Sequence, residues 1–190
     1  MRLSKIKKAL KSQKSGYILR TLTAEVEVRG NLYMWWLHIG ENYYAGENAI
    51  TPDQATLAAC MEMTEDEKDG ITLEVKDAVE AAQEVSRLSE IAQRIDLEAL
   101  VKNRDVTLSA GGQTVHLMEL EDGTWGMVRE EDVEPCYRKG EMLRWTRVAP
   151  VEDEGEWIAA YSSGELVSVM RLLDVPDVVR KLLRDMATRL

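Results

Sequence analysis

Two histidines and two cysteines are the residues of this chain best suited to metal binding or nucleophilic catalysis: His38, His116, Cys60 and Cys136. Zinc ligands usually come in pairs separated by roughly two to four residues, and no two of these four lie that close. No local motif frames either thiol as a catalytic nucleophile. We therefore predict a non-enzymatic protein with no catalytic residue, metal or cofactor; the alternative is an enzyme without a recognisable motif.

Carboxylates are the second chemically active group, and they are concentrated in one part of the chain. Residues 41–100 contain 15 acidic and 4 basic residues, within a net charge of −10. Such an acidic surface can bind a basic protein channel that normally holds nucleic-acid phosphates, although charged runs also serve solubility alone. We expect two acidic clusters to bind the partner: Glu65, Asp66, Glu67, Glu130, Glu131 and Asp132.

The first twenty residues have the opposite charge, with seven basic residues and no acid. The overall acidity argues against general binding to the DNA backbone. This basic segment could nevertheless contact DNA directly, or dock on the acidic part of the same chain. The lysines that we expect at a nucleic-acid contact are Lys5, Lys7, Lys8, Lys11 and Lys14.

Aromatic residues are the third group, and Phe is absent from the chain. Adjacent Trp35 and Trp36 must point to opposite faces of a regular strand. The aromatic cluster is a core built without Phe, a protein interface in which Trp and Tyr are favoured, or a stacking platform for single-stranded nucleic acid. For the partner-binding site we select Tyr33, Trp35, Trp36, Tyr43 and Tyr44.

The elements that must position these residues begin with a helix over residues 4–14, where apolar residues recur at helical spacing. Residues 17–45 alternate in polarity between glycine-containing turns, which predicts an antiparallel meander. Cap signals then predict helices near residues 51–61 and 64–70. The second of these begins with a capping box of Thr64 and Glu67, and a strand over residues 71–75 follows it.

The longest helix is expected between Asp77 and Val101. Seven apolar residues from Ala78 to Ala99 are spaced alternately three and four apart, which matches a heptad seam. The seam indicates either a dimer interface over residues 78–99 or a helix that lies on its own sheet. Four of the seven residues are Ala, which favours the second interpretation.

The remaining chain predicts strands and a final helix. Hairpins are expected around residues 110–112 and between segments 141–149 and 156–162, and residues 174–190 form an amphipathic helix with a basic face. We predict an α+β fold with antiparallel sheets, a long central helix and an amphipathic C-terminal helix. The proposed division is an N-terminal half (1–75), a connecting helix (76–103) and a β-rich half (104–190), or one compact domain.

The layout of the chain resembles uncharacterised small proteins of prophages from gut Firmicutes. The resemblance rests on a basic Lys-Ile-Lys helix, a Trp-containing strand that turns at Gly40 into Tyr43-Tyr44, a Thr-Pro-Asp helix start and the late segment Gly155-Glu-Trp-Ile-Ala-Ala-Tyr. It implies a phage or mobile-element origin and no established activity. Residues 104–120 are also similar to a hairpin of a bacterial sliding-clamp domain.

Together these features predict a non-enzymatic phage or mobile-element binding protein in the cytoplasm of a bacterial host. Its expected target is host nucleic-acid machinery, in the manner of an anti-CRISPR inhibitor that covers an effector nuclease with an acidic surface. The alternative is an accessory protein with a sliding-clamp-like domain, whose partner is a replication or recombination protein. The sequence has no evident signal peptide or membrane span, so we expect no membrane contact.

Overall fold

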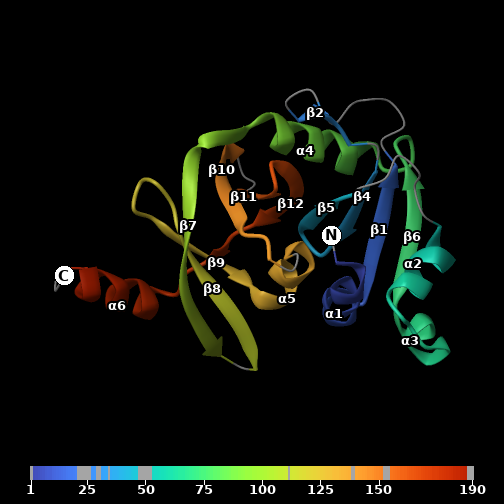
Figure 1. Ribbon diagram of the computed structural model, residues 1–190, viewed down its shortest axis with the longest axis horizontal. Coiled ribbons are helices and arrows are strands. Elements are labelled where there is room, and N and C mark those ends of the chain that lie inside the picture. The colour runs from blue at the N-terminus through green and yellow to red at the C-terminus, as the bar shows by residue number, and fades with distance from the viewer. Residues whose placement is uncertain are drawn as a thin grey trace.

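The computed structural model describes residues 2–20, 27–28, 31–33, 35–46, 53–110, 112–137, 140–151 and 155–187. Within these residues, eleven strands form one continuous sheet with helices on both faces, and two short strands form a separate ribbon (Figure 1). The α+β class expected from the sequence is confirmed.

The strands of the sheet are ordered β13-β9-β8-β7-β10-β11-β12-β5-β4-β1-β6, and β1 and β6 are the parallel pair among antiparallel neighbours. The ribbon pairs β2 with β3. In chain order the strands are β1 (Ser15–Arg20), β2 (Glu27–Val28), β3 (Asn31–Leu32), β4 (Trp35–Ile39), β5 (Asn42–Ala45), β6 (Thr72–Asp77), β7 (Ile95–Ala110), β8 (Gln113–Glu119), β9 (Trp125–Arg129), β10 (Leu143–Val151), β11 (Gly155–Ser162), β12 (Glu165–Arg171) and β13 (Leu173–Asp174).

The helices are short, and the longest has 12 residues. The expected capping box at the start of α3 is present: the Glu67 backbone donates to the Thr64 side chain over 3.3 Å, and the Thr64 backbone donates to the Glu67 carboxylate over 3.0 Å. The helices are α1 (Leu3–Gln13), α2 (Gln54–Cys60), α3 (Glu65–Gly70), α4 (Ala82–Gln93), α5 (Glu130–Val133) and α6 (Asp177–Ala187), with a 3₁₀ turn η1 (Glu134–Cys136).

Each face of the sheet has its own apolar cluster. On one face, Ile6 and Leu10 of α1, Leu57 of α2 and Val133 of α5 pack in a single core. On the other face, α4 is packed against the sheet in a second core. Burial of apolar side chains on both faces is the main contribution that holds the helices in these positions.

The expected long central helix over residues 77–101 is wrong: the observed helix begins only at Ala82, and the last part of the segment is a strand. The helix ends at Gln93, and the chain continues as β7, which pairs with β10. From Ile95 to Val101 the inward-facing side chains alternate with exposed ones, a period of two that fits a strand. Pairing with β10, about fifty residues away, therefore decided the structure against the helix propensity of this Leu-, Glu- and Ala-rich segment.

The middle of the heptad seam packs on the sheet of its own chain. Ala81, Val85, Leu88 and Ala92 are at most 4% exposed because α4 lies on this sheet. The interpretation of the seam as a helix on its own sheet accounts for these four side chains. A dimer through residues 78–99 stays a prediction, and it would have to use other side chains of the segment.

The two ends of the sheet are also the two ends of the molecule. Strand β6 and helices α2 and α3 lie at one end of the long axis, and α6 extends from the other end (Figure 1). Strand β12 pairs with β5, so the N-terminal and C-terminal halves share one sheet. Among the described helices, none combines the length and the apolar character that a membrane span needs.

Candidate functional site

The aromatic residues expected at a partner surface lie in the interior. Trp35 belongs to the core under α1, whereas Trp36 belongs to the core under α4, so the two rings point to opposite faces as predicted. Trp35 is 4% exposed and Trp36, Tyr43 and Tyr44 are fully buried. Tyr33 is half-buried, and its hydroxyl accepts from the Leu166 backbone. Four of the five rings therefore form core, and Tyr33 packs against the edge of the second core.

The basic N-terminal helix docks on acidic residues of its own chain. Lys5 and Lys8 pair with Glu134 at 3.4 and 3.2 Å. On the other side of α1, Lys7 pairs with Glu67 at 2.5 Å and Lys11 contacts the same carboxylate. Four of the five lysines expected at a nucleic-acid contact are therefore already paired with carboxylates, and exposed Lys14 follows the end of α1.

The ion pairs of Glu67 predict an acid-sensitive contact between α1 and α3. Hydrogen bonds from Lys11 and Lys7 lower the pKa of Glu67 from 4.5 to about 2. A carboxyl whose pKa is lowered on folding stabilises the fold above pH 4.5, and that contribution is lost as the pH falls toward about 2. We expect Glu67→Gln to reduce the stability difference between neutral and acidic solution, measured by urea unfolding across this range. Glu98→Gln, at an exposed position on β7, is the matched control; equal effects of the two substitutions would contradict the assignment.

The second acidic cluster is partly internal. Asp132 is 5% exposed, and its carboxylate accepts from the Arg129 guanidinium over 2.8 Å. Burial raises the pKa of Asp132, while Arg129 acts against this shift. Glu130 and Glu131 are half-buried at the start of α5. Asp132 is thus a structural ion-pair residue, and the cluster presents less free negative charge than its sequence indicates.

The histidines and cysteines do not converge. His38 on β4 and His116 on β8 are separated in the sheet by five intervening strands, Cys60 is exposed on α2 and Cys136 is buried in η1. Within the described residues, no three His, Cys, Asp or Glu side chains are grouped as metal ligands. His38 is instead stacked on Tyr43, with ring centroids 4.5 Å apart, and lies 5.4 Å from the ring of Tyr17.

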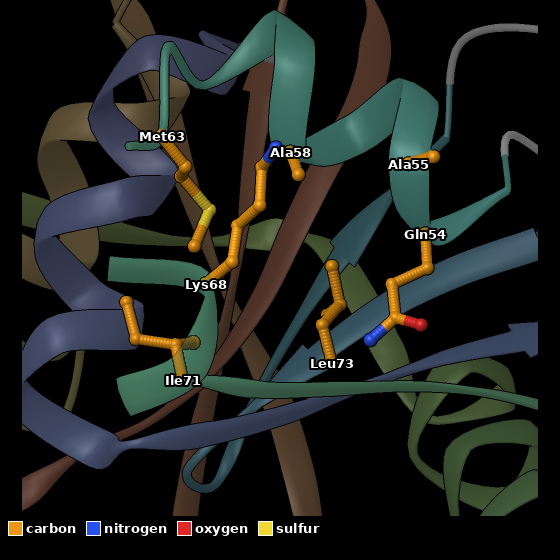
Figure 2. A pocket seen from close by; sticks show the side chains of 7 residues that line it. All are labelled: Gln54, Ala55, Ala58, Met63, Lys68, Ile71 and Leu73. Atoms are coloured by element: carbon orange, nitrogen blue, oxygen red, sulfur yellow. The ribbon is translucent and has the colours of Figure 1, made fainter. Parts of the chain in front are cut away.

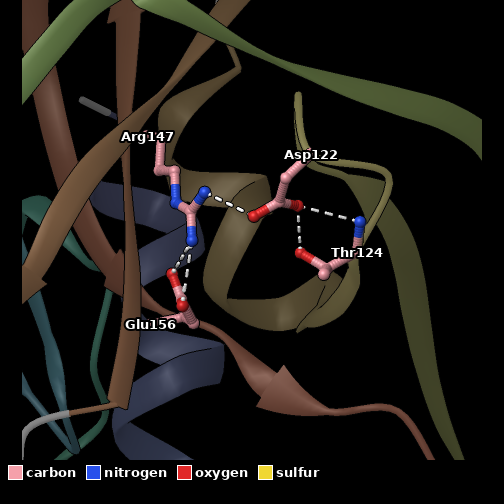
Figure 3. Close-up of polar contacts among 4 residues, drawn as sticks. All are labelled: Asp122, Thr124, Arg147 and Glu156. Carbon is pink, nitrogen blue, oxygen red and sulfur yellow. Dashed lines mark hydrogen bonds and ion pairs between the residues drawn. The ribbon is translucent and has the colours of Figure 1, made fainter.

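A third polar cluster, which the sequence did not indicate, ties the β8–β9 turn to the centre of the sheet (Figure 3). The Arg147 guanidinium lies 2.7 Å from the Asp122 carboxylate and 3.1 Å from that of Glu156. Hydrogen bonds from Thr124, with Arg147 on the other side, lower the pKa of Asp122 to about 2. The terminal nitrogens of the Arg147 guanidinium bind both carboxylates, although its Nε has no partner among the described residues, and we assign the cluster a structural role in positioning the turn.

A mostly apolar pocket lies between α2, α3 and β6, with a volume of about 240 Å³. Met63 and Leu73 extend into it from opposite sides, and the Lys68 side chain runs along it toward Ala58 (Figure 2). The pocket is lined by Gln54, Ala55, Ala58, Met63, Lys68, Ile71 and Leu73. A concave, mostly apolar site with few polar groups is the usual form of a binding pocket.

Exposed acidic residues lie on the segments that form this pocket, close to the lining residues in the sequence. Residues 53–74 contain seven acids and one lysine. Glu67 is neutralised by α1, but exposed acids flank the lining residues along the chain: Glu62, Glu65, Asp66, Asp69 and Glu74. We call the lining residues together with these five acids the acidic pocket, and we call the five acids its rim. It includes two of the acids expected from the sequence, Glu65 and Asp66.

The apolar members of the acidic pocket were missed by sequence reasoning. Ala58 lies on α2, Leu73 lies on β6, and Met63 and Ile71 lie in the connections before and after α3. All four look like ordinary core residues in the sequence. The available signal was the placement of Met63 and Ile71 directly on either side of the acidic helix α3. Apolar residues next to several acids are typical of the border between an apolar surface and a polar one.

Comparisons with known proteins leave the origin of the chain as a prediction. No family model, curated protein or solved structure matches it. The resemblances to prophage proteins and to a sliding-clamp hairpin therefore gain no support from them.

Proposed function

We propose that this protein is a non-enzymatic binding protein whose acidic pocket holds a basic amphipathic segment of a partner protein. The observation that supports the proposal is the combination of an apolar cavity of about 240 Å³ with exposed acids on the segments that form it. Apolar side chains of the segment would fill the cavity, and its basic side chains would lie against the rim. The rim would raise the association rate and select basic partners.

The size and lining of the pocket favour a side chain of a protein over a charged small molecule. Ala55, Ala58, Met63, Ile71 and Leu73 offer apolar contact, while Gln54 and Lys68 are the polar residues of the lining. Lys68 is paired with Glu65 at 2.8 Å, so its charge is compensated locally. Helix-in-groove recognition uses this arrangement of apolar contact and charged margin.

The proposal is tested with a fluorescent helical peptide in which Leu and Lys recur at helical spacing, so that they form opposite faces of the helix. Ala55→Arg places a bulky cation in the pocket, whereas Ala59→Arg adds the same charge on the same helix at an exposed position outside the lining. We expect binding by the wild type and Ala59→Arg, and at least about tenfold weaker binding by Ala55→Arg, equivalent to about 1.4 kcal/mol.

Two controls test whether opposite charges contribute to peptide binding. Added salt should weaken binding because the rim acids are exposed and easily screened. A peptide with Glu in place of Lys should not bind, because the rim would repel it. Equal binding by the two arginine variants would show that the peptide associates with the acidic surface generally, and would exclude the pocket.

The natural partner stays a prediction. An effector nuclease, or a replication protein, satisfies the proposal when it presents a basic amphipathic segment to the acidic pocket. Inhibition of a purified effector nuclease by wild type and Ala59→Arg, with loss in Ala55→Arg, would support the inhibitor hypothesis. Inhibition that survives Ala55→Arg would place the inhibitory surface elsewhere on the protein.

A further inference from the structure

The C-terminal helix α6 presents an apolar stripe to solvent. Val178 is 69% exposed and Leu182 is 58% exposed, and they lie one turn apart on the helix. Val179 and Leu183, beside them, are only half-buried. An isolated helix of 11 residues is marginal in water, and most helical stability in proteins comes from packing an apolar face. The exposed stripe therefore points to a contact that a single copy of the chain does not make.

The attachment of α6 fixes its direction away from the body of the protein. Val175, just before the helix, is 2% exposed, and the Arg180 guanidinium donates to the Val175 carbonyl over 3.1 Å. Strand β13 pairs with β9 at the edge of the sheet. Figure 1 shows α6 beyond this edge, at the end of the long axis opposite to α2 and α3.

The charges of α6 and of the acidic pocket are complementary. Arg180 and Lys181 are exposed beside the stripe, and Arg184 follows one turn later in the sequence. The helix has three basic residues and two acids, Asp177 and Asp185, so its net charge is +1. The acidic pocket includes five exposed acids, of which Glu65 and Glu74 also pair with Lys68 and Lys76. The two surfaces are therefore opposite in net charge, and both offer apolar side chains.

We propose that α6 of one copy docks in the acidic pocket of a second copy. This inference rests on the proposed function of the pocket, for which it names a partner. The two surfaces lie at opposite ends of the long axis of the molecule, so the α6 helix does not reach the pocket of its own copy (Figure 1). The contact is heterologous, and its repetition builds a ring or an open chain of subunits. One short helix on one pocket makes a small interface, so assembly depends on concentration.

The test measures mass by light scattering and native mass spectrometry over micromolar to millimolar concentrations. Leu182→Glu removes the stripe and leaves the pocket intact; Ala55→Arg blocks the pocket and leaves α6 intact. We expect the wild type to form oligomers and each variant alone to associate at least tenfold more weakly. Met142→Glu, at a position that is 92% exposed, and Ala59→Arg should assemble like the wild type.

Mixing the two defective variants gives the sharpest outcome. Leu182→Glu supplies an intact pocket and Ala55→Arg supplies an intact α6, so the mixture retains one functional contact per pair. We expect it to form heterodimers and nothing larger. Self-association of Ala55→Arg at the wild-type level, as in a symmetric α6–α6 dimer, would overturn the inference.

Three further outcomes separate this inference from the proposed function. A wild type that stays monomeric at all concentrations overturns the inference, while peptide binding that is lost in Ala55→Arg still supports the pocket. A wild type that stays monomeric but cosediments with phosphatidylserine vesicles, in a manner lost in Leu182→Glu, identifies α6 as a lipid-binding helix and also overturns it. If assembly is lost in Ala55→Arg but the wild type does not bind the Leu/Lys peptide, the pocket binds only a second copy of this chain. That outcome supports the inference and contradicts the proposed function.

Discussion

Replacing Trp36 with alanine is expected to lower the free energy of unfolding by about 4 kcal/mol, and Trp35→Ala is expected to have a similar effect. Both rings are buried, on opposite faces of the sheet, and truncation of a buried Trp typically costs roughly 3–5 kcal/mol because it removes apolar contact and leaves a cavity. Guanidinium unfolding followed by far-UV circular dichroism measures both values. Val79→Ala, at a position that is 86% exposed, is the control and should change stability by less than about 0.5 kcal/mol.

The same two substitutions also distinguish the core interpretation of the aromatic cluster from an interface and from a stacking platform for nucleic acid. A ring at a partner surface or on a nucleic-acid stacking platform contributes little to the folding of the isolated protein. A cost near that of the Val79 control for either tryptophan would therefore show that its ring is free for a partner, and would contradict the two-faced core.

His38 is expected to make the protein acid-sensitive. Burial, and then the positive charge of Arg87, lower the pKa of His38 from 6.5 to about 4. Between these two values the unfolded chain binds a proton that the folded protein excludes, so stability falls as the pH falls. The complete loss, reached below about pH 4, amounts to about 3 kcal/mol. Charged side chains near the ring on α4, β6 and the β4–β5 turn are Glu84, Arg87, Lys76 and Glu41.

His38→Phe tests this prediction because the new ring can keep the stack on Tyr43. Neither ring nitrogen of His38 has a hydrogen-bond partner among the described residues, so the substitution also removes two unsatisfied polar atoms. We expect the variant to be about 1 kcal/mol more stable at pH 7 and to lose the part of the acid dependence between pH 6.5 and 4. The measurement is urea unfolding at a series of pH values. Retention of the full wild-type slope in this range would show that other groups cause it.

Local signals predicted local structure well. The capping box of Thr64 and Glu67 joins residues three positions apart, and it is present. The turn around residues 110–112 connects β7 to β8 in register, from Ala110 opposite Gln113. The opposite directions of Trp35 and Trp36 follow from strand geometry alone. In each case the interacting groups are close in the sequence, so their types and spacing are sufficient.

Long-range packing decided the features that the sequence did not predict. Residues 95–101 have good helix formers, yet β10 pairs with them as a strand. The Trp36 ring is covered by α4, which begins more than forty residues later in the chain. No pattern near Trp36 in the sequence indicates this contact. Lys8 meets Glu134 across most of the chain, so the free charge of the basic segment and of the acidic cluster was overestimated. The pocket assembles from α2, α3 and β6 for the same reason.

Methyl NMR during titration with the Leu/Lys peptide shows directly whether basic amphipathic segments bind in the acidic pocket. Met63, Ile71 and Leu73 provide methyl reporters in the pocket, while Ile158 and Met170 report from the centre of the sheet. We expect saturable shifts at the three pocket residues, little change at the two central ones, and no pocket shifts in Ala55→Arg. Shifts that leave Met63, Ile71 and Leu73 unchanged while other surface methyls move would contradict binding in the acidic pocket.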